Sequence, residues 1–178
     1  MHYCQIKNCD IADGPGVRVT LFVSGCRNHC PGCFQQETWD FQYGKPFDRE
    51  VEDRLLSMLK PDYICGLTLL GGEPFEPENQ RALYPFLQRV RAEYPGKSIW
   101  YFSGYTFEEM LREGAHPHTE CTEAILALGD MLVDGRFILE QKDLTLRFRG
   151  SRNQRILMLP ESLKARAPVH WPEENLRG

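Results

Sequence analysis

The sequence predicts an α/β fold made of one domain, a partial (open) βα barrel with a mostly parallel sheet. Apolar, β-branched runs alternate along the chain with amphipathic segments, and this order is typical of parallel sheets with right-handed helical crossovers. A complete eight-unit barrel typically needs ~250 residues, whereas this chain has 178. The alternation and the length together favour an incomplete barrel.

Four apolar segments are expected to form the parallel strands. In the first, alternate residues from Val17 to Val23 share one face. The second is apolar almost throughout, as is usual for a strand buried on both faces. The four strands are expected at residues 17–23, 64–70, 98–102 and 131–133. Alternation at 144–149 and an apolar run at 155–159 predict two further strands.

Helices are expected between these strands, where apolar residues recur at helical spacing. The predicted ranges are 49–59, 79–94 and 120–128. Pro61 ends the first helix, and Pro85 predicts a kink in the second. Thr106 and Glu109 have the spacing of a capping box, which predicts the start of another helix.

The chain is expected to form a single domain, 1–178, with its core at about 10–157. No internal repeat, linker or low-complexity tract divides the sequence. The composition of residues 168–178 predicts a poorly ordered, flexible tail.

Composition and charge narrow the class of protein. Hydrophobic residues make up 42% of the chain and charged residues 26%, as in a soluble globular protein. The net charge of −4 and the pI near 5.8 argue against nucleic-acid or anionic-membrane partners. No apolar run approaches the ~20 residues of a membrane helix, and the first residues do not resemble a signal peptide. A cytoplasmic location is therefore expected, where thiols remain reduced.

The most informative motif is a loop with three closely spaced cysteines directly after the first predicted strand. Cys26, Cys30 and Cys33 have the spacing C-x3-C-x2-C. A [4Fe–4S] cluster usually takes four cysteine thiolates, so three of them would leave one iron with an open position. An open position is what separates a catalytic metal site from a closed structural one. The loop therefore predicts a cluster to which a ligand can bind.

Zinc and disulfides are the alternative uses of these cysteines. A structural zinc site normally adds a second Cys or His pair downstream; here His29 lies inside the loop, and Cys65 and Cys121 stand alone. Seven cysteines is an odd number, which disfavours a complete set of disulfides. Cys4 and Cys9 are a further pair that could bind metal, although their spacing is weak evidence for it.

Three other loops also follow predicted strands. They are Gly71-Gly72-Glu73-Pro74, Ser103-Gly104-Tyr105 and Asp134-Gly135-Arg136. Ligand sites in parallel α/β sheets gather beyond the carboxyl ends of the strands, so these loops are expected to face the cysteines across one mouth. Alone, the Gly-Gly-Glu-Pro run reads as a tight turn. Beside a cluster, its glycines would let a ligand approach and Glu73 could accept a hydrogen bond from an ammonium group.

Several of these segments carry a family resemblance that covers about residues 10–157. The cysteine motif resembles that of the radical S-adenosylmethionine enzymes, and the sequence is similar to the glycyl-radical-enzyme activases within that superfamily. Its short length and its later segments most resemble the activating proteins of anaerobic ribonucleotide reductase. The segments that carry the resemblance are 13–18, 38–40, 103–106, 132–137 and 149–154.

The resemblance implies an iron–sulfur enzyme that cleaves S-adenosylmethionine reductively to a 5′-deoxyadenosyl radical. That radical would remove a hydrogen atom from a glycine of the reductase's glycyl radical subunit, with a flavodoxin as electron donor. Gly71, Gly72 and Glu73 would contact the methionine amino group. Asp134 matches a position that binds the methionine end, in some members through a monovalent cation, and Ser103 lies in a neighbouring loop. The cofactor supplies the difficult chemistry and the protein positions it.

The chain departs from the pattern of the superfamily at the residue that would contact adenine. Many members of the superfamily have an aromatic residue just before the third cysteine, where this chain has Gly32. Phe34, on the other side of Cys33, could supply a ring instead, or could point into the core.

A basic cluster near the C-terminal end has two readings. Its members are Arg147, Arg149, Arg152 and Arg155. They could steer an acidic surface of the reductase towards the site, or they could be the solvated edge of a last strand.

Two other functions stay open on the sequence. A small radical S-adenosylmethionine enzyme acting on a free metabolite, similar to 7-carboxy-7-deazaguanine synthase, would need polar substrate-holding residues and often a wider cysteine spacing. A non-catalytic electron-transfer or zinc module would need a fourth protein ligand, which the loop lacks.

Overall fold

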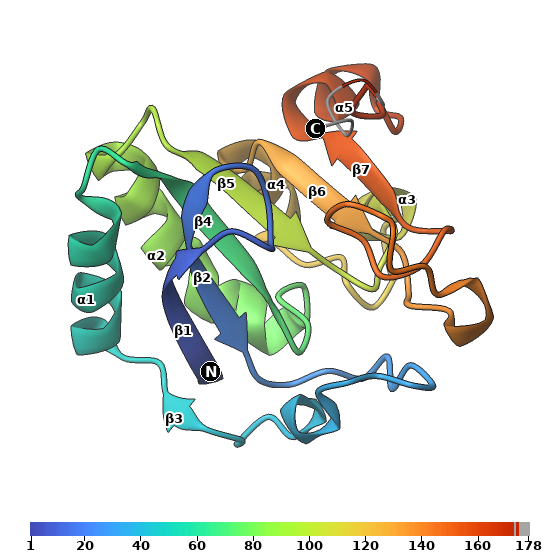
Figure 1. The fold of residues 1–178 in the computed structure, drawn as a ribbon, viewed down its shortest axis with the longest axis horizontal. Helices are drawn as coiled ribbons and strands as arrows, with labels where there is room; N and C mark the ends of the chain where they lie inside the picture. Colours follow the sequence, from blue (N-terminus) through green and yellow to red (C-terminus); the bar gives the residue numbers. More distant parts are fainter. Residues whose placement is uncertain (173, 175–178) are drawn as a thin grey trace.

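One mixed sheet organises the protein. The computed structural model describes residues 1–172 and 174, and within them seven strands follow the order β3-β1-β2-β4-β5-β6-β7 (Figure 1). Their bounds are β1 His2–Asp10, β2 Val17–Val23, β3 Lys45–Pro46, β4 Ile64–Gly71, β5 Ser98–Phe102, β6 Met131–Asp134 and β7 Arg155–Met158. The four central strands β2, β4, β5 and β6 are parallel, whereas β1, β3 and β7 pair antiparallel at the edges. The predicted α/β class and the parallel centre are confirmed.

Five α-helices and two 3-10 helices lie within the described residues. Their bounds are α1 Arg49–Leu59, α2 Pro77–Glu93, α3 Phe107–Leu111, α4 Thr122–Leu128, α5 Leu159–Ala165, η1 Gln36–Trp39 and η2 Leu139–Gln141. Pro85 lies inside α2, and the capping box of Thr106 and Glu109 is present. The three predicted helices are confirmed within two residues at each end. None of the helices in the described part of the chain is long and apolar enough to cross a membrane.

The structure differs from the expected elements in three places. Strand β1 occupies the N-terminal residues, to which the sequence pattern assigned no element. Residues 144–149 form turns instead of a strand, because the Asp143 carboxylate accepts hydrogen bonds from Thr145 N and Oγ1 and Phe148 has a φ of 56°. The predicted tail is ordered in part: Val169 O accepts from β7 and Trp171 N donates to β7. Residues 173 and 175–178 lie outside the described residues.

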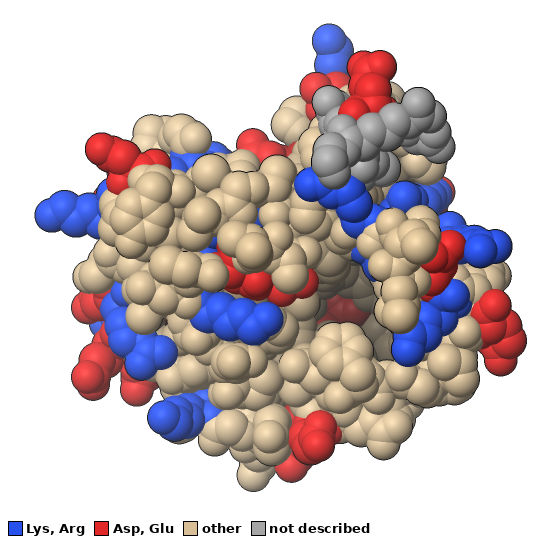
Figure 2. All heavy atoms as spheres, in the orientation of Figure 1, with Lys and Arg blue, Asp and Glu red and all other residues tan. Residues whose placement is uncertain are grey.

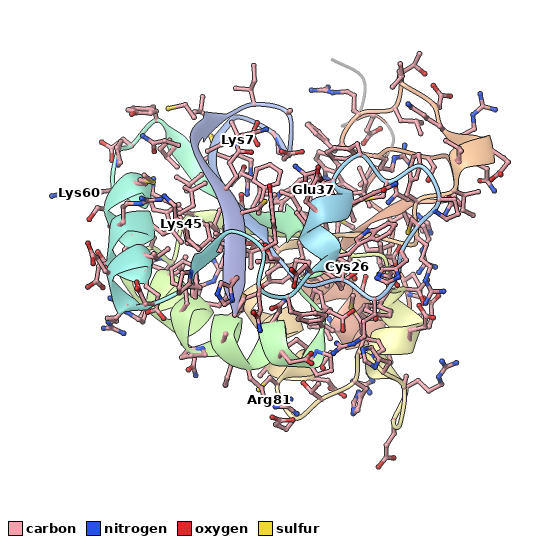
Figure 3. The ribbon with its side chains drawn as sticks, turned by 90° about the horizontal axis from the view of Figure 1, so that it is seen from below. Lys7, Cys26, Glu37, Lys45, Lys60 and Arg81 are labelled. Atoms are coloured by element: carbon pink, nitrogen blue, oxygen red, sulfur yellow. The ribbon has the colours of Figure 1, made fainter. Side chains whose placement is uncertain are left out.

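The two faces of the sheet have different coverings. On one face, alternate strand residues such as Leu21, Leu69 and Tyr101 pack in the main core with apolar side chains of all five α-helices. On the other face, Trp100, Met131, Val133 and Ile156 form a smaller cluster, against which Phe148 and Trp171 pack. Figures 1 and 3 show α1 and α2 on one side of the sheet and the loops on the other. The loop-covered face is therefore the face available for a site.

Arg18 is buried within the parallel part of the sheet and makes its hydrogen bonds to uncharged acceptors. Its guanidinium donates to Thr68 Oγ1 at 2.7 Å, Ser98 Oγ at 2.9 Å and Leu67 O at 2.8 Å. Burial lowers its pKa to about 10. Arg18, near the amino end of β2, therefore links the three neighbouring strands β2, β4 and β5.

Candidate functional site

A cavity of about 570 Å³ opens at the carboxyl ends of the parallel strands. Figure 2 shows a hollow on this side of the molecule with Lys and Arg side chains on its rim. The structure brings together most of the predicted site residues here: the cavity is lined by Cys26, Cys30, Cys33, Phe34, Gly71, Gly72, Glu73 and Ser103. Four of the loops that line it follow β2, β4, β5 and β6, as expected for a parallel sheet.

The cysteine loop is held in place by main-chain contacts with its neighbours. Gly25 N donates to Thr38 O at 2.8 Å, and Glu73 N donates to Gly25 O at 2.9 Å. Cys26 N donates to Trp39 O at the end of η1, which lies beside Cys26 in Figure 3. The loop therefore leaves the sheet in a defined direction, between η1 and the turn after β4.

Two residues inside the C-x3-C spacing tie this loop to the rest of the protein. The guanidinium of Arg27 pairs with the buried Glu76 and with Glu78, and Arg27 N donates to Glu76 at 2.8 Å. Asn28 Nδ2 donates to Glu73 at 3.0 Å, and Asn28 Oδ1 accepts from Arg136 at 3.0 Å. The sequence reasoning missed Asn28 and Glu76. Their position between two cysteines and just after the Gly-Gly-Glu-Pro turn is the signal that could have found them.

The three cysteines of the loop are free thiols that line one cavity. All seven cysteines are free, and no three His, Cys, Asp or Glu side chains in the described residues converge on one position that could hold a metal ion. A cluster takes its thiolates at different irons, so its ligands surround a space instead of meeting at a point. Burial raises the pKa of Cys26 to about 12 and also raises that of Cys30. Burial therefore disfavours free thiolates at these two positions.

Glu73 is more enclosed than the sequence suggested. Its side chain is fully buried, and its two oxygens accept from Phe75 N at 2.9 Å, Ser103 Oγ at 2.8 Å, Gly104 N at 2.7 Å and Asn28 Nδ2 at 3.0 Å. These four donors fill the usual acceptor positions of a carboxylate. Glu73 therefore joins three loops at the cavity wall, and its hydrogen bonds are made within the protein.

Asp134 does not reach the cavity with its side chain. It is fully buried and accepts from Arg155 Nε at 2.8 Å, Arg155 Nη2 at 2.5 Å and Phe107 N at 2.8 Å. It lines a neighbouring groove of about 730 Å³ instead. Since Arg155 already supplies the positive charge, the residues at Asp134 do not fit a monovalent cation.

Of the remaining predicted residues, some line the cavity and others do not. Ser103 lines the cavity, but its hydroxyl donates to Glu73. Phe34 is 86% exposed, so it does not belong to the core, and it borders the cavity. Gly32 has a φ of 76° and lies close to the Leu139 side chain. Cys4 lies half-buried and Cys9 exposed on β1, and neither lines the cavity.

Gly72 is the position at which an added methyl group should most disturb the contact between the two loops. A Cβ there would lie 2.7 Å from Gly25 O and 3.0 Å from Thr38 O, both main-chain atoms. We expect Gly72→Ala to lower the free energy of unfolding by about 1–3 kcal/mol and to reduce the iron content after reconstitution. Urea denaturation and iron analysis measure the two effects. Gly96→Ala is the matched control, since a Cβ at Gly96 meets no atom within 4 Å; equal behaviour of the two variants would contradict this reading.

Glu73 also predicts a pH dependence of stability. Burial raises its pKa from 4.5 to about 7. Because the folded state holds the proton more tightly, the stabilisation is complete below pH 4.5 and is lost as the pH rises through about 7. We expect the metal-free protein to lose on the order of 3 kcal/mol of unfolding free energy across this interval relative to Glu73→Gln. Urea denaturation of both proteins at several pH values measures the difference, and parallel pH profiles would contradict the assignment.

Comparison with known proteins shows the family to which the chain belongs. A family model described as a 4Fe-4S single cluster domain matches residues 12–157. The chain is 43% identical over 156 residues to an anaerobic ribonucleoside-triphosphate reductase-activating protein of Vibrio cholerae, covering 86% of this chain and 96% of the relative. The relative of the same name from Escherichia coli K12 is 40% identical with the same coverage. The one from Enterobacteria phage T4 is 37% identical over 158 residues, which is 88% of this chain and 93% of the relative.

Both the span of the family model and the identity over most of each relative exceed what a shared fold alone would give. The matched residues include the cysteine loop and the three other loops that line the cavity. The chain therefore belongs to the 4Fe-4S single cluster domain family and, within it, to the anaerobic ribonucleoside-triphosphate reductase-activating proteins.

Proposed function

We propose that this protein is an enzyme that activates an anaerobic ribonucleotide reductase by generating a glycyl radical on the reductase's glycyl radical subunit. Its cofactors would be a [4Fe–4S] cluster and S-adenosylmethionine. The observation that carries the proposal is that three cysteines and the Gly-Gly-Glu loop line one cavity at the ends of parallel strands. The printed names of the relatives support the reaction and the partner. The cytoplasm is the proposed location.

The chain's own residues would divide the work as follows. Cys26, Cys30 and Cys33 would hold the cluster and leave one iron open to the amino-acid end of the ligand. When bound, the two cofactors would supply the radical chemistry: the transfer of one electron would break the bond between the sulfonium and the 5′ carbon, giving methionine and a radical able to take a hydrogen atom from glycine. A reduced flavodoxin is the proposed donor of that electron.

The turn after β4 would receive the methionine amino group. Gly71 has a φ of 111° and Gly72 lies against Gly25 O, so main-chain atoms are close to the cavity with no side chain between. Glu73, held by four donors, would attract the ammonium group through its charge. Ser103 would act by orienting Glu73. Phe34 is the proposed contact for adenine, because it is the aromatic residue of the cysteine loop that borders the cavity.

The finer description of the fold is also part of this proposal. The sheet carries helices on one face and the cavity at the carboxyl ends of its four parallel strands. An open βα barrel of the radical S-adenosylmethionine type has this arrangement. No monovalent cation is proposed at Asp134, because Arg155 and Phe107 N occupy its oxygens.

A protein substrate is favoured over a free metabolite by the mouth of the cavity. Phe34 is 86% exposed and Leu144 is 88% exposed, and both border the cavity. Exposed apolar side chains around an opening are typical of protein contacts.

The test is to incubate the reconstituted protein with the reductase, reductant and S-adenosylmethionine under anaerobic conditions and record the electron paramagnetic resonance spectrum. We expect a glycyl radical doublet on the reductase. A reductase variant with the target glycine replaced by alanine is the control and should give no doublet. Cleavage of S-adenosylmethionine without a glycyl radical on the wild-type reductase would favour the metabolite enzyme instead.

A further inference from the structure

We propose that Arg149 binds the carboxylate of the amino-acid end of the ligand, in the cavity that Glu73 also lines. This inference rests on the proposed function, because it takes S-adenosylmethionine as the ligand. Arg149 lines the cavity together with Glu73 and the three cysteines.

The structure separates the members of the basic cluster, which the sequence treated alike. Arg155 pairs with Asp134 and Glu108, and Arg152 Nε pairs with Asp143 at 3.0 Å. Arg147 is exposed, with its guanidinium 5.1 Å from the ring of Phe148. Arg149 is half-buried and has no carboxylate partner among the described residues. Arg149 is thus the cluster's arginine whose charge is left for a ligand.

The hydrogen bonds of Arg149 are incomplete. Nη1 donates to Gln154 O at 3.2 Å, while Nε is buried without any hydrogen-bond partner in the described part of the chain. A buried donor without an acceptor is costly, and most such groups in native proteins have a partner. A guanidinium matches a carboxylate in geometry, because its N–H groups form a planar fork. Because Nε has almost no accessible surface, the N–H group that a ligand's carboxylate can reach is Nη2, which makes no hydrogen bond within the described residues.

The backbone around Arg149 fixes its position. Phe148, with its φ of 56°, packs edge-on against Trp100 at a centroid distance of 5.6 Å. On the other side, Gly150 N and Ser151 N donate to Gln154 Oε1 at 2.8 and 3.1 Å. Both neighbours of Arg149 are held, so this residue lines the cavity from a constrained turn. Constraint of this kind lowers the entropic cost of binding.

Two other charged residues line the same part of the cavity, and neither offers an equal site. Lys142 is exposed to solvent, which weakens its interaction with a ligand charge. The Asp143 carboxylate already accepts from Thr145 and Arg152. An ammonium near Glu73 and a carboxylate near Arg149 would then orient a zwitterionic amino-acid end along the cavity.

The test compares two ligands and three proteins. Dissociation constants are measured anaerobically on reconstituted, unreduced protein for S-adenosylmethionine and for decarboxylated S-adenosylmethionine, which lacks only the carboxylate. We expect Arg149→Met to weaken binding of S-adenosylmethionine about tenfold or more and to leave binding of the decarboxylated ligand within about twofold. Arg147→Met, the matched control, should change neither constant.

The outcomes are distinguishable. If Arg149→Met weakens both ligands equally, or neither, Arg149 does not recognise the carboxylate and the inference is wrong. Arg149→Lys keeps the charge with a shorter reach and should show an intermediate loss confined to S-adenosylmethionine, which guards against misfolding of the methionine variant. Failure of the wild-type protein to bind S-adenosylmethionine at all would instead overturn the proposed function.

Discussion

Cys30→Ala is expected to abolish the intact cluster and all cleavage of S-adenosylmethionine. Cys30 lines the cavity between Cys26 and Cys33, and two remaining thiolates would not hold a [4Fe–4S] cluster whose open iron must stay free for the ligand. Iron and sulfide analysis after anaerobic reconstitution, with the visible absorption of the cluster, measures the first effect. Chromatographic detection of 5′-deoxyadenosine measures the second.

Cys9→Ala is the matched control for that experiment. Cys9 is an exposed free cysteine on β1 and does not line the cavity. We expect this variant to bind iron and cleave S-adenosylmethionine like the wild type. Full cleavage by Cys30→Ala, or equal loss in both variants, would show that the motif does not hold the cluster in the proposed way.

Glu73→Ala is expected to weaken S-adenosylmethionine binding by roughly tenfold or more, while the cluster still assembles. The substitution removes the charge at the cavity wall and leaves four buried donors without their acceptor. Each orphaned donor costs about 1–3 kcal/mol, so the free energy of unfolding should fall by several kcal/mol as well. Calorimetric titration with S-adenosylmethionine and urea denaturation measure these two quantities.

Glu73→Gln separates charge from hydrogen bonding in the same position. Its amide keeps one acceptor oxygen but places two N–H donors where the protein already donates. We therefore expect a smaller loss of stability than in the alanine variant, together with a similar loss of affinity. An unchanged dissociation constant in both variants would remove Glu73 from the ligand site.

The sequence predicted the centre of the fold better than its edges. The four parallel strands are buried and strongly apolar, so their runs of apolar residues can be recognised in the sequence. Strand β1 was missed because only Tyr3 and Asp10 are buried in it, and polar residues are mixed among the others without a regular alternation. The alternation at 144–149 wrongly predicted a strand, because local hydrogen bonds from Thr145 to Asp143 bend the chain there.

The location of the candidate site could be predicted from the sequence, but the hydrogen bonds and ion pairs between its side chains could not. Loops after parallel strands meet at one edge of the sheet, and this placed the cysteines beside Gly71 and Gly72. The ion pair between Asp134 and Arg155 and the hydrogen bond from Asn28 to Glu73 join residues that are far apart in the chain. Such pairings depend on tertiary packing, which no local pattern in the sequence records.

The measurement that most directly tests the central claim is electron paramagnetic resonance of the reduced, reconstituted protein with and without S-adenosylmethionine. The ligand should change the signal of the reduced cluster, and 5′-deoxyadenosine should appear in the same sample. Both results are expected because three protein thiolates leave one iron open. A cluster signal that is indifferent to S-adenosylmethionine, or a protein that takes up zinc and stays colourless, would contradict the account.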